Sequence, residues 1–126
     1  MPEVDLFATL DTVVLRVHDV DAAKAWYQAK LGLEVSSEDM GERLVTFELR
    51  GGTSLTLLEL KRGESLLETL GVVGTFPVFA VRDARHAWEV LREREVLVDP
   101  LRDAGPVLSF EFRDLDGNKL EVRETA

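Results

Sequence analysis

The sequence predicts an α+β fold made of two βαβββ modules in a single domain. Runs rich in β-branched and aromatic residues, which favour strands, alternate with two segments whose apolar residues recur at helical spacing. The order of one strand, one helix and three strands occurs in the first half of the chain and again in the second. Because 126 residues have room for one ordinary hydrophobic core, we expect a single domain over residues 1–126.

The first module is predicted over about residues 8–60. Its first strand, residues 10–17, is rich in β-branched side chains. A helix over residues 20–31 follows, with apolar residues at helical spacing, and Gly32 can end it. Three further strands are then expected, at residues 33–36, 43–49 and 54–60.

The second module is predicted over about residues 76–124, after a linker at residues 61–75. It begins with a strand at 76–81 and a helix at 84–94. Pro77 cannot donate a ladder hydrogen bond, so it is expected at a strand start or a free edge. Three strands complete the module, at residues 96–98, 107–113 and 119–122.

The two modules also agree in residue type, which favours an internal duplication over chance similarity. Val17-His18-Asp19 precedes a helix that contains Trp26, and Val81-Arg82-Asp83 precedes a helix that contains Trp88. Both tryptophans fall on the apolar side of their helix, so they are predicted to belong to the core.

The composition excludes several classes of protein. Lys and Arg number 15 against 24 Asp and Glu, and a net charge of −9 repels phosphate backbones, so nucleic acid is not an expected partner. No stretch approaches the roughly 20 apolar residues of a membrane span, and no membrane partner is expected. The acidic N-terminus lacks the features of a secretory signal, so we expect a cytoplasmic protein. The absence of cysteine excludes disulfides and Cys-ligated zinc.

Motifs near both ends of the chain are similar to those of a known superfamily. The first is Val14-Leu15-Arg16-Val17-His18-Asp19, followed by Trp26-Tyr27 and Leu31-Gly32-Leu33. The second is Phe112-Arg113-Asp114-Leu115-Asp116-Gly117-Asn118-Lys119-Leu120-Glu121. With these motifs the chain resembles the vicinal oxygen chelate superfamily, the glyoxalase/bleomycin-resistance/dioxygenase group, over about residues 10–122.

The resemblance implies a curved, mostly antiparallel sheet with the helices on its outer face and a concave cleft inside. It also implies a homodimer with the cleft at or near the interface. One residue departs from the closing motif, since Leu115 stands where the superfamily usually has proline.

The resemblance further implies four metal-ligand positions in the metal-dependent members, two in each module. They fall on Thr12, Glu59, Phe76 and Glu121. Only the two glutamates can coordinate a metal well, and catalytic zinc, nickel or iron sites need at least three protein ligands. A transition-metal enzyme is therefore disfavoured and no cofactor is expected, although Glu59 and Glu121 with waters can hold Mg²⁺ or Mn²⁺.

Strand alternation and the resemblance together predict which side chains line the cleft. The predicted lining combines apolar side chains with charged ones, and such a mixture suits a mostly apolar small-molecule ligand with a polar or cationic group. The alternative is surface salt bridging among the same charges. The predicted ligand-binding residues are Thr12, Val14, Arg16, Leu57, Glu59, Phe76, Val78, Glu111 and Glu121.

Three functions are open at this point. The leading hypothesis is a metal-independent small-molecule binding protein of the antibiotic-resistance type. The second is a glyoxalase- or dioxygenase-type enzyme with a divalent metal on Glu59 and Glu121, where Glu121 is the candidate catalytic residue because paired carboxylates in an apolar cleft can have well-separated pKa values. The third is a non-catalytic scaffold or regulatory protein, because a fold alone does not fix a function.

Overall fold

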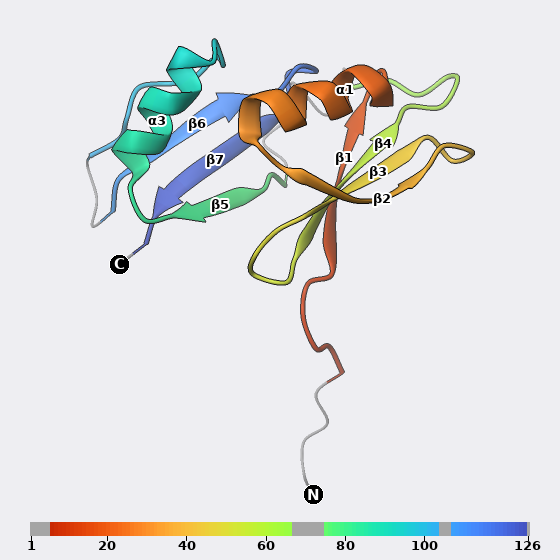
Figure 1. Ribbon diagram of the computed structural model, residues 1–126, viewed down its shortest axis with the longest axis horizontal. Helices are drawn as coiled ribbons and strands as arrows, with labels where there is room; N and C mark the ends of the chain where they lie inside the picture. The colour runs from red at the N-terminus through yellow and green to blue at the C-terminus, as the bar shows by residue number, and fades with distance from the viewer. Residues whose placement is uncertain (1–5, 67–74, 104–106, 126) are drawn as a thin grey trace, which may run out of the picture.

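The computed structural model describes residues 6–66, 75–103 and 107–125, and it contains two small sheets with a helix packed on each (Figure 1). The first sheet has the strand order β1-β4-β3-β2, and the second has the order β5-β7-β6. The elements are β1 (Thr12–Val17), α1 (Val20–Trp26), η1 (Tyr27–Leu31), β2 (Glu34–Asp39), β3 (Leu44–Glu48), β4 (Ser54–Glu59), β5 (Val78–Val81), α3 (Ala84–Glu93), β6 (Ser109–Arg113) and β7 (Lys119–Glu124).

The predicted α+β fold of two modules is confirmed. The described strands form two sheets, whereas one curved, mostly antiparallel sheet was expected. Both sheets are mixed, because β1 pairs parallel with β4 and β5 pairs parallel with β7, while the other pairs are antiparallel. The strand predicted at residues 96–98 is reduced to an isolated bridge between Val98 and Phe112. Pro77 directly precedes β5, which is an edge strand, as expected. Residues 67–74 of the linker lie outside the described residues.

The helix predicted at residues 20–31 consists of α1 and the π-helical turn η1, and it ends at Gly32. Gly32 has a φ of 67°, a left-handed conformation that glycine adopts without a Cβ clash. Asp19 caps α1 by accepting hydrogen bonds from the amides of Asp21 and Ala22. The helix therefore starts and stops where its end residues predict.

The starts of α1 and α3 are built in the same way, which confirms that the modules correspond. Glu59, at the end of β4, accepts a hydrogen bond from the Val20 amide, and Glu124, at the end of β7, accepts one from the Ala84 amide. These two amides are the first of their helices, so each carboxylate lies at the positive end of a helix dipole. Glu59 and Glu124 are therefore counterparts, and so are the strands that carry them.

Each sheet buries the face that its helix covers. Tyr27 stacks on Phe47 in the first module, and Phe79 stacks on Phe112 in the second. The largest fully buried side chains of this core are Val17, Val20, Tyr27, Val45, Phe47, Leu55, Leu57, Phe110, Phe112 and Leu120. No helix in the described ranges packs on the opposite face of either sheet, which is called the open face below (Figure 1).

Asp114, in the turn between β6 and β7, joins the modules. The Tyr27 hydroxyl donates to this carboxylate at 2.6 Å, and burial raises the pKa of both groups. The amides of Asp116 and Asn118 and the Asn118 side chain also donate to it. The Asn118 side-chain amide also donates to the carbonyl of Arg16, at 3.0 Å, and so links the turn to the first module.

No helix in the described part of the chain is long and apolar enough to cross a membrane.

Candidate functional site

The open face of the second sheet carries a row of three residues, one from each strand. Strand register places Val78 on β5 beside Glu121 on β7, and Glu121 opposite Glu111 on β6. Val78 is 44% exposed, whereas Glu121 retains only 8% of its surface. All three were predicted to line the cleft, and the fold brings them together.

Glu111 is neutralised by two cations. Its Oε1 atom lies 2.7 Å from Lys119 Nζ and 2.8 Å from Arg102 Nη2. These contacts, that of Lys119 foremost, lower the pKa of Glu111, so it is an anion near neutral pH. The salt bridging considered from the sequence therefore applies to this glutamate.

Glu121 is different, because its carboxylate has no hydrogen bond or ion pair with any residue that the structure describes. Like charges directly opposite each other on neighbouring strands repel, and Glu111 is its cross-strand neighbour. Arg123 follows two residues later on the same face but is exposed and makes no ion pair with it in this structure. Glu121 therefore differs from Glu111, whose carboxylate is held by Lys119 and Arg102.

Phe76 lies two residues before Val78 in the chain. Lys119 Nζ is 4.0 Å from the centroid of the Phe76 ring, a cation–π distance. Phe76 is partly exposed, so part of its ring is accessible beside Lys119. The face thus has an aromatic ring and an aliphatic side chain near a carboxylate that has no partner in the described residues.

The open face of the first sheet carries the corresponding row, and it is uncharged. Val14, Thr56 and Thr46 lie side by side on β1, β4 and β3. The Thr56 hydroxyl is 2.7 Å from that of Thr12 and 3.1 Å from that of Thr46, so the polar groups here pair with one another. Thr12 and Val14 were predicted on this face, whereas Thr46 and Thr56 were not.

The placement of Leu57 and Glu59 on the open face is wrong. Leu57 is fully buried in the core, and Glu59 points to the helix side. There Arg43 Nη2 donates to Glu59 Oε2 at 2.8 Å and lowers the pKa of this carboxyl, with a smaller contribution from the Val20 amide. Odd and even positions on β4 are exchanged relative to the prediction, since Thr56 and Leu58 face outward.

Arg16 does lie on the open face, but its guanidinium is already paired. It forms a bidentate ion pair with Glu64 at 2.5 and 3.0 Å, which lowers the pKa of Glu64 to about 2. It also donates to the carbonyls of Leu58 and Glu59. Sequence reasoning missed Glu64, because a partner in the linker becomes a neighbour only through the fold.

The register identifies the module-one counterpart of Glu121. Since Glu59 matches Glu124, Glu121 matches Thr56, three residues earlier in each case. The four positions of the ligand set are then Thr12, Thr56, Phe76 and Glu121, which include a single carboxylate. One carboxylate, two hydrogen-bonded hydroxyls and a phenyl ring do not fit a divalent metal. The described residues contain no group of three or more His, Asp or Glu side chains that could hold a metal ion.

Fold and site together define an α+β protein of two corresponding modules, each with a helix on one face of its sheet. The family model of the Glyoxalase/Bleomycin resistance protein/Dioxygenase superfamily matches residues 9–122, and the chain belongs to this superfamily. No curated protein matches the chain significantly.

Solved structures of the same fold include proteins of different activities. UcmS2 is 27% identical to this chain, with a TM-score of 0.80 and coverage of 95% of this chain and 100% of its own. Lactoylglutathione lyase from Agrobacterium tumefaciens is 26% identical, with a TM-score of 0.73 and coverage of 95% and 96%. TnmS3, an antibiotic binding protein from Streptomyces sp. CB03234, shares the fold at 20% identity and a TM-score of 0.77, with coverage of 97% and 99%.

Proposed function

We propose that this protein binds a small hydrophobic cation on the open face of its second sheet, without a metal. The observation that carries the proposal is Glu121, a residue that keeps 8% of its surface and whose carboxylate has no partner among the described residues. A ligand cation can supply the missing partner, and Phe76 and Val78 offer apolar contact beside it.

The fold alone does not decide between binding and catalysis. TnmS3 is an antibiotic binding protein and lactoylglutathione lyase is an enzyme, so the superfamily accommodates both. The decision rests on the ligand set, in which Glu59 is withdrawn to the helix side. The metal-dependent alternative through Glu59 and Glu121 loses its second ligand, and Glu121 alone gives no acid–base pair. We therefore favour binding.

A direct test compares 4-phenylbutylamine with its neutral analogue 4-phenylbutan-1-ol by isothermal titration calorimetry on chelator-treated protein. The amine should bind and the alcohol should bind at least tenfold more weakly. Glu121→Gln should reduce amine affinity at least tenfold. Glu124→Gln is the matched control, because Glu124 lies on the same strand but faces the helix; it should leave the affinity unchanged.

A second experiment addresses the metal. Thermal unfolding is followed with and without Mg²⁺, Mn²⁺, Zn²⁺, Ni²⁺ or Fe²⁺, since a ligand at 100 times its Kd adds about 2.7 kcal/mol to the free energy of unfolding. We expect no shift that depends on Glu121. A metal-induced shift that Glu121→Gln abolishes would contradict the proposal and favour the enzyme.

We also propose that the protein is a homodimer. Leu6, Phe7 and Leu10 are 80%, 87% and 63% exposed on a segment that extends away from the body before β1 (Figure 1). Exposed apolar side chains gathered on one segment are typical of a surface that another chain covers. Light scattering should give twice the monomer mass, and Leu6→Ser with Phe7→Ser should shift it toward the monomer.

A further inference from the structure

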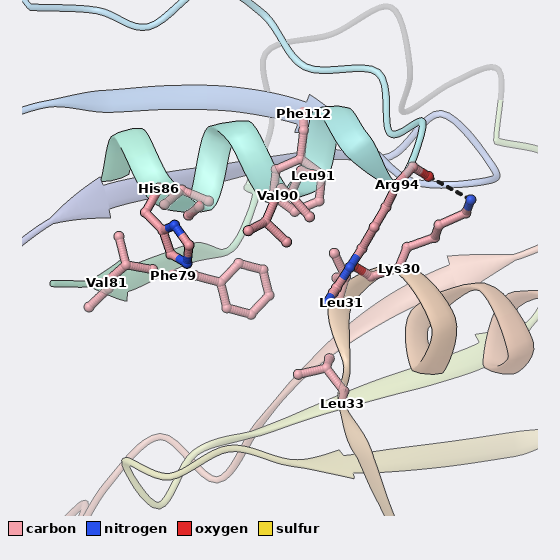
Figure 2. A pocket seen from close by; sticks show the side chains of 13 residues that line it. Lys30, Leu31, Leu33, Phe79, Val81, His86, Val90, Leu91, Arg94 and Phe112 are labelled. Carbon is pink, nitrogen blue, oxygen red and sulfur yellow. Dashed lines mark hydrogen bonds between the residues drawn. The ribbon is translucent and has the colours of Figure 1, made fainter. Parts of the chain in front are cut away.

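A cavity lies on the helix side of the molecule, away from the open sheet faces. It has a volume of about 440 Å³ and is formed between α3, β5 and the end of η1 (Figure 2). Val90 and Leu91 from α3 and Phe79 from β5 give it an apolar wall, and Leu31 and Leu33 contribute from the first module. A cavity of this size, at a junction of two modules, is within the range of sites for small ligands.

The ionisable side chains that line this cavity are all of basic residues. They are Lys30, His86 and Arg94, and no Asp or Glu of the described residues lines it. The whole chain has 24 acidic and 15 basic residues, so an exclusively basic lining departs from the overall balance. An anion is therefore favoured here, and a cation is not.

Lys30 and Arg94 hold each other at the junction without neutralising their charges. Lys30 Nζ donates to the Arg94 carbonyl at 2.6 Å, and Arg94 Nη1 donates to the Lys30 carbonyl at 2.9 Å. Neither side chain forms an ion pair with a carboxylate in the described ranges. Each keeps further N–H donors free, and Figure 2 shows the Arg94 side chain reaching from α3 toward Leu31.

We propose that this cavity binds a small hydrophobic carboxylate, with the apolar part against Phe79 and Val90 and the carboxylate at Lys30 and Arg94. The apolar wall accounts for affinity through burial, and the guanidinium is suited to a bidentate carboxylate. The site is separate from that of the proposed cation and is opposite to it in charge preference.

The test uses 4-phenylbutyrate, which has the carbon skeleton of the amine and alcohol probes above. Its binding is followed by calorimetry and by amide shifts in ¹⁵N-labelled protein. We expect the carboxylate to bind at least tenfold more tightly than the alcohol, with the largest shifts at Leu31, Val81 and Val90. Lys30→Met with Arg94→Gln should weaken it at least tenfold, which corresponds to about 1.4 kcal/mol.

Two controls separate this site from a general charge effect. Arg85→Gln removes one positive charge from α3, outside the cavity lining, and should leave the affinity unchanged. Glu121→Gln should not affect 4-phenylbutyrate either, so failure of the cation site and failure of this one are distinguishable. Val90→Phe fills the cavity without changing charge and should abolish binding even if the double variant is unstable.

Three results would overturn the proposal. The first is the absence of shifts at Leu31, Val81 and Val90 at millimolar 4-phenylbutyrate. The second is equal affinity for the carboxylate and the alcohol, which would mean an apolar cavity without anion preference. The third is an equal loss of affinity in Arg85→Gln and in the Lys30 and Arg94 variant.

Discussion

The two modules have the same framework, but the side chains on their open faces differ in chemistry. In the first, Val14 is followed across the sheet by Thr56 and Thr46; in the second, Val78 is followed by Glu121 and Glu111. The threonine hydroxyls pair with each other, whereas the Glu121 carboxylate pairs with no described residue. At equivalent positions, the hydroxyls of the first module therefore pair with one another, and the carboxylate of the second has no partner among the described residues.

The framework residues, in contrast, are nearly identical in the two modules. Asp19 and Asp83 cap their helices, and Glu59 and Glu124 accept from the first helical amide. A shared framework with different open faces is compatible with the proposed binding role, because stability would depend on the first and recognition on the second.

The largest difference in stability between the modules is expected at their matched turns. Asp114 begins the turn of the second module, and Leu49 has the equivalent place in the first. In each turn, the glycine three residues later has a positive φ. Asp114→Ala removes the acceptor of four donors, one of them the buried Tyr27 hydroxyl. We predict a loss of about 3 kcal/mol in urea unfolding.

The matched control is Thr53→Ala in the turn of the first module. Thr53 donates to the Leu10 carbonyl in an exposed position, so its loss should cost less than about 1 kcal/mol. Equal losses in the two variants would show that the turns contribute alike and that Asp114 does not join the modules.

Most of the framework could be predicted from the sequence, because each element carries its own local signal. Helix starts and ends follow from Asp19, Asp83 and Gly32, and the open face of β7 follows from the clean alternation of Lys119 to Arg123. These signals are short-range and need no knowledge of the rest of the fold.

The face of β4 could not be predicted in this way. Leu55, Leu57 and Leu58 lie almost in succession, so apolar periodicity does not say which side faces the core, and the glutamate at the end was assigned to the wrong face. Long-range partners were missed for a different reason. Glu64 and Arg102 lie in segments without regular structure, and they reach Arg16 and Glu111 only through the three-dimensional arrangement.

The next largest effect should be a gain in stability. Glu121→Gln removes a carboxylate that has no partner in the described residues and lies opposite Glu111, so we expect the free energy of unfolding to rise by about 1 kcal/mol. Urea unfolding at pH 7 measures it. A loss of stability would mean that Glu121 has a structural partner, and it would remove the main contrast between the two open faces.

Thr56→Val tests the same position in the first module. It removes a hydroxyl shared by Thr12 and Thr46, so the protein should lose roughly 0.5–1 kcal/mol in the same assay. Affinity for 4-phenylbutylamine should not change, because the proposed site belongs to the second module. A loss of amine affinity as large as in Glu121→Gln would show that both open faces contribute to one site.

The smallest expected effect is on how the free energy of unfolding depends on pH. It distinguishes Glu59 from Glu124, the two glutamates that accept a hydrogen bond from the first amide of a helix. Arg43 lowers the folded-state pKa of Glu59, so this carboxylate stabilises the fold above its unfolded pKa of about 4.3, and the stabilisation is lost as pH falls through the lower folded value. Glu124 accepts the matching helix amide but has no cation partner in the described residues.

Urea unfolding from pH 3 to pH 7 should therefore show wild type and Glu59→Gln converging at the acidic end. Glu124→Gln is the comparison, because it removes the matching helix-amide contact and no ion pair with a described residue. The same pH dependence in both variants would assign the effect to the helix dipole, and the framework would then be symmetric in its charges as well as in its hydrogen bonds.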